Sequence, residues 1–230
     1  MSEPVGAIFF DAVGTLIRPE PNVAAVYTEA GKRHGSALCT DEIRDRFFRE
    51  FARHVRLDEM RCWKTSEDNE VHRWRQIVKR VFPDVRDTEA CFRELWDHFA
   101  RPESWRLTDG AGEVLCELLR RGWVLGLASN FDSRLRGIVD GFPDLWTLTH
   151  IVISSEVGWL KPAPQFFEQV KSCVQVPSEK ILFVGDDRRN DYAGAEAAGL
   201  TPVLYDPSDR EPAFRGFRIP HLRELLLSCD

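Results

Sequence analysis

The sequence predicts an α/β protein: a Rossmann-like, doubly wound parallel sheet with an inserted α-helical bundle. Two observations predict the sheet. Short apolar runs recur along the chain, and helical patterns separate them, which is the alternation typical of parallel strands joined by helices. A third observation predicts the insert, because residues 19–103 contain four helical patterns and no strand pattern.

The strands of the predicted sheet are apolar runs without polar alternation, as is typical of strands buried on both faces. They lie at 5–10, 123–128, 151–154, 181–184 and 202–205. Between them, apolar residues recur at helical spacing, most clearly over 111–119 and more loosely over 166–174. We therefore expect helices on both faces of a parallel sheet.

The insert is predicted to be a helical bundle, because its apolar residues form four stripes at helical spacing. The stripes lie at 23–30, 43–55, 71–81 and 92–99. Thr40-Asp41 and Asp87-Thr88 are predicted N-terminal caps. The chain is thus expected to divide into a core domain, residues 1–18 and 104–230, and a helical cap domain, residues 19–103.

Composition narrows the classes of protein. The chain of 230 residues is 43% hydrophobic and 30% charged, as in an ordinary globular protein. A net charge of -6 argues against nucleic-acid binding. The six cysteines form no CxxC pair, which argues against zinc and thioredoxin-like chemistry. With no signal peptide and no apolar run of about 20 residues, we expect a reduced, cytoplasmic protein without a membrane partner; the sequence indicates no oligomeric state.

Polar residues follow three of the predicted strands or lie beside them. Asp11 ends the first apolar run, where a carboxylate can attack an electrophile while Thr15 holds the loop behind it. Ser129-Asn130 ends a later run and can hold an anionic oxygen. Lys161 precedes a proline, which fixes the backbone and directs the cation from a rigid loop. Each segment also has a structural interpretation, as a polar strand end, an ordinary turn or a solvated lysine.

The acidic segment after the fourth run is more specific. Asp186, Asp187 and Asp191 crowd one strand-to-helix turn, where their mutual repulsion needs a compensating cation. Carboxylate and carbonyl oxygens are the ligands that Mg²⁺ prefers. Gly194 and Gly199 would let the following helix pack closely on the strand. The segment therefore predicts a Mg²⁺ site.

Together these segments resemble the four motifs of the haloacid-dehalogenase-like hydrolase superfamily, in order and spacing, across the whole chain. The segment GDDRRNDYAGAEAAG is similar to the fourth motif. The insert resembles the helical cap of subfamily IA, which includes phosphoglycolate phosphatase and the haloacid dehalogenases. Ser-Asn-Phe-Asp-x-Arg at 129–134 resembles the rhythmically-expressed-protein-like branch, whose cap carries Trp-Trp where this chain has Arg73-Trp74.

The resemblance implies a role for each matched residue. Asp11 would be the nucleophile, and Lys161 would neutralise charge between nucleophile and substrate. Thr15, Ser129, the backbone of Asn130 and Lys161 are predicted to bind the phosphoryl group. The predicted metal ligands are Asp11, the carbonyl of Val13, Asp186 and Asp191.

The implied function is Mg²⁺-dependent hydrolysis of a small phosphorylated metabolite through an aspartyl-phosphate at Asp11. Val13 departs from the pattern, because phosphatases of this family usually carry there an aspartate that acts as general acid and base. Two alternatives stay open: a 2-haloacid dehalogenase, which needs no proton donor but has lost the acidic fourth motif, and a catalytically weak phosphate-binding protein. On the cap, we expect Trp74 to belong to the hydrophobic core rather than to the site.

Overall fold

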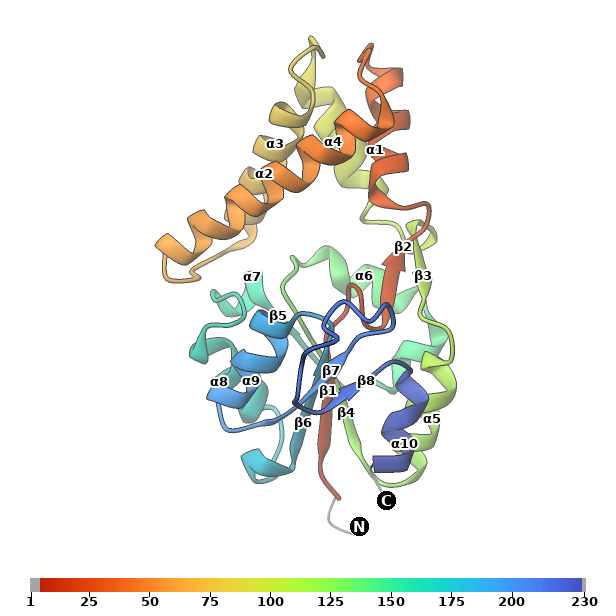
Figure 1. Cartoon of the computed structure of the whole chain (residues 1–230), viewed down its shortest axis with the longest axis vertical. Coiled ribbons are helices and arrows are strands. Elements are labelled where there is room, and N and C mark those ends of the chain that lie inside the picture. Colours follow the sequence, from red (N-terminus) through yellow and green to blue (C-terminus); the bar gives the residue numbers. More distant parts are fainter. Residues whose placement is uncertain (1–4, 229–230) are drawn as a thin grey trace.

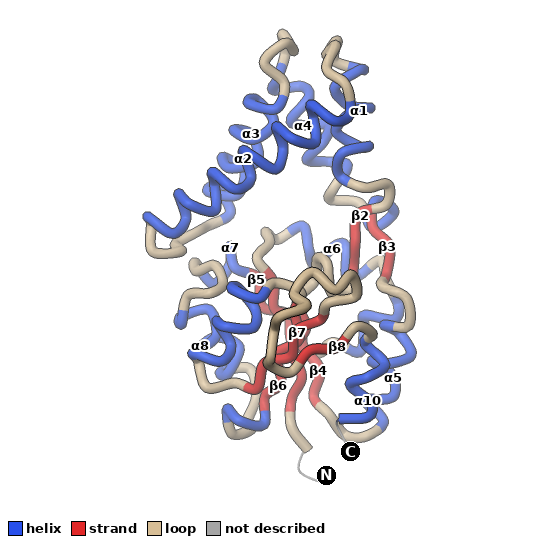
Figure 2. The backbone as a smooth tube through the Cα atoms, in the orientation of Figure 1, coloured by secondary structure: helices blue, strands red, loops and turns tan. Residues whose placement is uncertain are grey.

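The computed structural model describes residues 5–228, and its main element is a six-stranded sheet of order β5-β4-β1-β6-β7-β8. Every neighbouring pair in the sheet is parallel. The central strand β1 pairs with β4 on one side and β6 on the other. The tube drawing shows the strands of the sheet, in red, among the helices of the lower part of the molecule (Figure 2). The predicted doubly wound sheet is confirmed. The strands of the sheet are β1 (Ala7–Phe10), β4 (Val124–Ser129), β5 (His150–Ile153), β6 (Ile181–Gly185), β7 (Thr201–Tyr205) and β8 (Arg218–Ile219).

Helices cover both faces of this sheet (Figure 1). The flanking helices are α5 (Ala111–Arg120), α6 (Arg134–Asp140), α7 (Ser154–Val157), α8 (Pro164–Ser172), α9 (Gly194–Ala197) and α10 (Leu225–Ser228). Short 3-10 turns span Pro102–Ser104, Pro143–Thr147, Ser178–Lys180 and Leu222–Glu224, and a π-helical turn spans Arg188–Ala193. Among residues 5–228, no helix is both long and apolar enough to cross a membrane.

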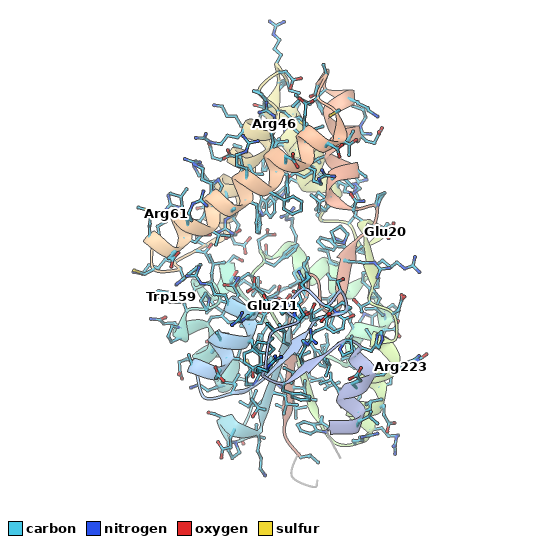
Figure 3. The ribbon with its side chains drawn as sticks, in the orientation of Figure 1. Glu20, Arg46, Arg61, Trp159, Glu211 and Arg223 are labelled. Carbon is cyan, nitrogen blue, oxygen red and sulfur yellow. The ribbon has the colours of Figure 1, made fainter. Side chains whose placement is uncertain are left out.

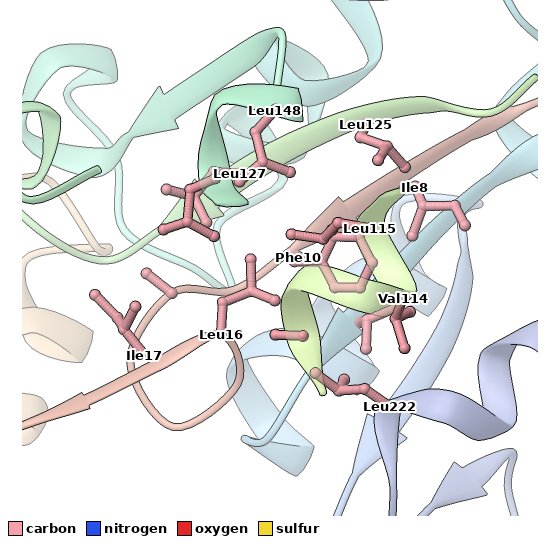
Figure 4. Close-up of a cluster of buried hydrophobic side chains, with 14 of the residues drawn as sticks. Ile8, Phe10, Leu16, Ile17, Val114, Leu115, Leu125, Leu127, Leu148 and Leu222 are labelled. Atoms are coloured by element: carbon pink, nitrogen blue, oxygen red, sulfur yellow. The ribbon is translucent and has the colours of Figure 1, made fainter. Parts of the chain in front are cut away.

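The alternation of side chains along β1 explains why an unbroken apolar run forms a central strand. Ile8 and Phe10 pack into the cluster under α5, α6 and α10, shown in Figure 4. Ala7 and Phe9 point the other way and pack with α8 and α9. All four side chains are fully buried, so both faces of the strand need apolar residues.

Four helices follow the first strand along the chain and precede the other strands of the sheet. In space they lie above the carboxyl edge of the sheet (Figure 1). Their shared core is built from the apolar stripes found in the sequence, including Tyr27, Ile43, Val78 and Phe92. A two-stranded antiparallel ribbon connects these helices to the sheet. The helices are α1 (Val23–Arg33), α2 (Thr40–Met60), α3 (Glu67–Val81) and α4 (Thr88–His98), and the ribbon is β2 (Ile17–Pro19) with β3 (Trp105–Leu107).

Three local predictions have different outcomes. Asp87 caps α4 as expected, because its side chain accepts a hydrogen bond from the Ala90 N–H at 2.9 Å. The cap at Thr40 was wrong: Cys39 is the N-cap, and the Glu42 side chain accepts from the Cys39 N–H at 3.0 Å. Gly199 was also misread, because its φ of +79° closes a turn and no atom crowds it.

Candidate active site

Three adjacent strands bring the predicted site residues to one edge of the sheet. Asp11 follows β1, Ser129 ends β4 and Asp186 follows β6. Because β1 lies between β4 and β6, these side chains become neighbours although more than 100 residues separate Asp11 from Ser129. The N–H of Asp11 donates to the Val184 carbonyl at 2.8 Å, which extends the pairing of β1 with β6 to the site.

Asp11, Asp186 and Asp191 form one acidic cluster. One carboxylate oxygen from each lies within 4.8 Å of the others. Two glycines make room for them: a Cβ on Gly14 would lie 2.6 Å from the Asp186 carboxylate, and a Cβ on Gly185 would lie 2.2 Å from the Asp191 carboxylate. The glycines of these two motifs therefore serve the close approach of carboxylates, which their spacing alone did not reveal.

Lys161 neutralises part of this cluster. Its ammonium group is buried and donates to Asp11 Oδ1 at 2.7 Å, to Asp191 Oδ1 at 2.6 Å and to the Ala128 carbonyl at 3.1 Å. Burial works to lower the pKa of Lys161, but the two carboxylates outweigh burial and hold that pKa above its usual value. Burial raises the pKa of Asp191, and the Lys161 ammonium opposes this rise. Lys161 therefore stays positively charged.

Ser129 and Asn130 position the nucleophile and the lysine. Ser129 Oγ donates to Asp11 Oδ1 at 2.9 Å. The Asn130 side chain pairs with the backbone of Lys161: Nδ2 donates to the carbonyl at 3.0 Å, and Oδ1 accepts from the N–H at 2.7 Å. The side chain of Asn130 thus fixes the loop that carries Lys161, a contact that the sequence did not predict. Phosphoryl binding by its backbone stays a prediction.

The carboxylate of Asp186 is unfavourable in its charged form and pairs with Arg210. Burial, followed by the nearby charge of Asp11, raises the pKa of Asp186 to about 6. Arg210 donates from Nη2 to Asp186 Oδ2 at 3.0 Å and pulls in the opposite direction. Arg210 lies in the loop after β7, where no sequence pattern marks it as part of the site.

Val13 and Thr15 occupy very different positions in the loop after Asp11. Val13 is half-buried and lines the cavity above the carboxylates. Among residues 5–228, no group donates a hydrogen bond to the Val13 carbonyl. Thr15 is fully buried and does not line the cavity, and its Oγ1 has no hydrogen-bond partner there. The Thr15 N–H donates to the Ala12 carbonyl at 3.3 Å, so the loop turns back on itself here. Phosphate binding by Thr15 stays a prediction.

A cavity of about 500 Å³ lies between the carboxylates and the four helices. Its floor includes Asp11, Asp186 and Lys161. Trp74 lines it while also packing against the core of the helical bundle, so the expectation of a purely structural tryptophan covers only part of its role. The sequence did not predict the size or the lining of this cavity, because periodicity marks an apolar face without showing what covers it.

The helices touch the sheet domain beside Lys161. The Leu160 N–H donates to the Trp63 carbonyl at 2.8 Å, and the Thr65 N–H donates to the Gly158 carbonyl at 3.1 Å. We call these two bonds the main-chain bridge. Figure 3 labels Arg61 and Trp159, which lie on the two sides of this contact. The loop that carries Lys161 is thus held both by the side chain of Asn130 and by the backbone of residues 63 and 65.

Comparison with known proteins places the chain in a family. The family model "haloacid dehalogenase-like hydrolase" matches residues 5–199. The chain is 30% identical over 168 residues to haloacid dehalogenase-like hydrolase domain-containing protein 3 of Bos taurus, covering 68% of this chain and 67% of that protein. It is 34% identical over 155 residues to a phosphoserine phosphatase of Thermus thermophilus, covering 61% of this chain and 55% of that enzyme.

The fold also matches a solved structure over its whole length. The putative HAD-hydrolase YfnB of Bacillus subtilis, solved bound to magnesium, superposes with a TM-score of 0.74. The match covers 99% of this chain and 100% of that one, at 18% sequence identity. At this identity the likeness shows the fold alone.

Proposed function

Because the chain belongs to the haloacid dehalogenase-like hydrolases, we propose that it hydrolyses a small phosphomonoester through an aspartyl-phosphate at Asp11, with Mg²⁺ as cofactor. One observation carries this proposal. The buried Asp11 carboxylate lies in a single cluster with Asp186 and Asp191, and a buried lysine contacts two of the three. Such a cluster combines a nucleophile with ligands for a hard cation.

The chemistry of the donors fits Mg²⁺. Asp11, Asp186 and Asp191 offer carboxylate oxygens, and the Val13 carbonyl has no other partner among residues 5–228. These four groups would hold the ion, which prefers oxygen ligands. When bound, it would neutralise charge on a phosphoryl group. Three clustered carboxylates face one buried lysine and the more exposed Arg210, and this excess of negative charge also favours a further cation.

In this proposal the protein's own groups orient the attack. Ser129 and Lys161 both donate to Asp11 Oδ1, which leaves Oδ2 without a partner among the described residues. Asp11 attacks phosphorus, the bond to the leaving oxygen breaks, and Lys161 offsets negative charge on the phosphoryl oxygens. Water then attacks the phosphorus of the aspartyl-phosphate, the P–O bond to Asp11 breaks, and the protons of the water stay on the released phosphate, which restores the Asp11 carboxylate.

Val13 restricts the leaving groups on which this reaction can act. Its side chain lines the cavity beside Asp11 but has no proton to give to a leaving oxygen or to take from water. Leaving groups that depart as stable anions do not need that proton. We therefore propose that the enzyme acts on esters with acidic leaving groups and turns over alkyl phosphates slowly.

The 2-haloacid dehalogenase alternative is less consistent with the site. Halide also leaves without a proton, which agrees with Val13. However, displacement of a halide needs no metal ion, whereas here Asp186 and Asp191 lie beside the nucleophile as a set of metal ligands despite the burial that raises their pKa values. Retention of these acids favours phosphoryl transfer.

We further propose that residues 19–103 act as a cap domain on a core of residues 1–18 and 104–230. The ribbon of β2 and β3 joins the two parts, and the cavity lies between them. The cap would exclude water from the phosphoryl group and supply the surface that recognises the leaving group.

The test is phosphate release from acetyl phosphate, aryl phosphates and alkyl phosphates, together with halide release from 2-haloacids, each with Mg²⁺ or EDTA. We expect Mg²⁺-dependent phosphate release that Asp11→Asn abolishes. Val13→Asp should raise turnover of alkyl phosphates by up to about 10²–10⁴-fold, the usual contribution of a general acid and base. Halide release without Mg²⁺, or phosphate release that persists in Asp11→Asn, would refute the proposal.

A further inference from the structure

The wall of the cavity opposite the carboxylates is almost entirely aromatic and aliphatic. Nine aromatic side chains besides Tyr27 line the cavity, seven of them from the helical bundle. Four of these form a continuous group on α2 and α3 that we call the aromatic panel: Phe47, Phe48, Phe51 and Trp74. Ring centroids within the panel lie 5.6–6.4 Å apart, and the Phe47 ring is nearly parallel to those of Phe51 and Trp74.

The same wall offers almost nothing to a polar ligand. None of the bundle residues that line the cavity is charged, and Tyr27 supplies the only hydroxyl among them. Burial holds the pKa of Tyr27 above its usual value, so this hydroxyl stays neutral. A sugar, a carboxylate or a second phosphate in the leaving group would lose its water here without finding partners, which is unfavourable.

The two cations that line the cavity are both occupied. Lys161 is bound to Asp11 and Asp191. Arg134 donates to both oxygens of Asp132 at 2.7 and 2.8 Å and to the Trp96 carbonyl at 2.9 Å, and its guanidinium lies 3.4 Å from the centre of the Trp96 ring. Arg134 therefore rigidifies the aromatic wall instead of offering a free charge to a ligand.

Part of the aromatic panel is uncovered. Phe48 is 62% exposed and Phe51 is 38% exposed, although both line the cavity. Uncovered rings grouped over a reactive carboxylate are typical of a surface that binds an apolar ligand. A cavity of about 500 Å³ is the size that encloses a small molecule of one or two rings.

We propose that the natural substrate is a small aryl phosphate monoester, whose aromatic leaving group packs against the aromatic panel while its phosphoryl group faces Asp11. This inference rests on the proposed phosphatase function and specifies its substrate class. Attack by Asp11 forms the new P–O bond as the bond to the aryl oxygen breaks. The aryloxide leaves with the electron pair and takes its proton from water, so no acid is needed at Val13.

The experiment compares kcat/KM for three phosphates in the presence of Mg²⁺: acetyl phosphate, phenyl phosphate and 2-naphthyl phosphate. Phenyl and 2-naphthyl phosphate have leaving groups of similar acidity and differ in apolar area. We expect kcat/KM to be about 10-fold higher for 2-naphthyl phosphate than for phenyl phosphate, from burial of the second ring. Trp74→Ala and Phe51→Ala should reduce the preference for the naphthyl over the phenyl ester by about 3- to 10-fold.

Two further variants separate an effect of the aromatic panel from a general effect of removing an exposed ring and from an effect on folding. Phe217→Ala is the matched control, because Phe217 is 38% exposed like Phe51 but does not line the cavity, and it should leave all three rates unchanged. Phe48→Ala removes a mostly exposed ring, so it tests the panel with little effect on folding. It should also reduce the preference for the naphthyl ester.

The outcomes separate the two proposals. Hydrolysis of acetyl phosphate with no preference for 2-naphthyl over phenyl phosphate would overturn the aryl inference and keep the phosphatase. If no phosphate is hydrolysed, the phosphatase proposal fails, and binding of 2-naphthol measured by its fluorescence decides the role of the panel. Binding that Trp74→Ala and Phe48→Ala weaken would support an aromatic ligand, and undetectable binding to the wild type would exclude one.

Discussion

Replacing Asp186 by asparagine should stabilise the metal-free protein while removing its response to Mg²⁺. The carboxylate of Asp186 is buried beside Asp11, and its pKa is raised from 3.8 to about 6. A rise of this size corresponds to about 3 kcal/mol against the charged form. An isosteric amide removes the charge and keeps an oxygen that can accept from Arg210. For a chain of this length we expect a gain in Tm of about 6–12 °C without metal.

The sign of the pH dependence follows from the direction of the shift. Because the folded-state pKa of Asp186 lies above its unfolded value, the cost of its charge is absent at low pH and grows as the pH rises through about 6. The advantage of Asp186→Asn should therefore be full above pH 7 and shrink toward pH 4. With saturating Mg²⁺ the order should reverse, because only the wild type retains the complete set of ligands.

The assay is thermal unfolding followed by circular dichroism, from pH 4 to 8, in EDTA or in Mg²⁺. Asp187→Asn is the control, since Asp187 is the neighbouring acid but caps the Arg189 and Asn190 N–H groups at 2.8 Å, a role that asparagine performs equally well. It should change Tm little at any pH. A metal-free Asp186→Asn protein that is less stable than the wild type at pH 8 would refute the reasoning.

Three other outcomes follow from the same geometry. Arg210→Gln should tighten Mg²⁺ binding about 3- to 10-fold in calorimetric titration, because Arg210 competes for Asp186 Oδ2, and weaker binding would contradict this. Lys161→Met should lower the metal-free free energy of unfolding by about 3–5 kcal/mol in urea titrations, because it leaves two buried carboxylates without their shared cation, and a stability equal to the wild type would argue against that charge balance. If the bundle closes as a cap, BeF₃⁻ with Mg²⁺ should slow hydrogen exchange near Arg18 and Glu103, and unchanged protection there would count against closure.

The sequence predicted five of the six strands of the sheet because strands buried on both faces are short apolar runs, here separated by helical patterns. It missed β2, β3 and β8, which are only two or three residues long and carry exposed or half-exposed side chains. Such strands owe their existence to pairing partners that are distant along the chain, and local composition does not encode them.

The acidic cluster was predictable because parallel topology brings the ends of β1, β4 and β6 together. The composition of the cavity wall could not be predicted in the same way. Phe48 and Phe51 share a helical stripe with Ile43, and all three were assigned to one apolar face, but only Ile43 is fully covered by other helices. Whether an apolar side chain meets a neighbour or an opening depends on the distance between packed elements, which periodicity does not report.

The main-chain bridge has a consequence for the order of events during a catalytic cycle. Its two hydrogen bonds join residues 63 and 65 to residues 158 and 160, directly before Lys161. If the helical bundle moves away from the sheet about the β2–β3 ribbon to admit a ligand, the main-chain bridge must break first. Entry of the ligand would then coincide with loosening of the loop that holds the Lys161 ammonium beside Asp11. Lys161 would again be held firmly beside Asp11 only after the main-chain bridge had re-formed. Opening of the cavity and the position of the Lys161 ammonium would therefore both depend on these two hydrogen bonds.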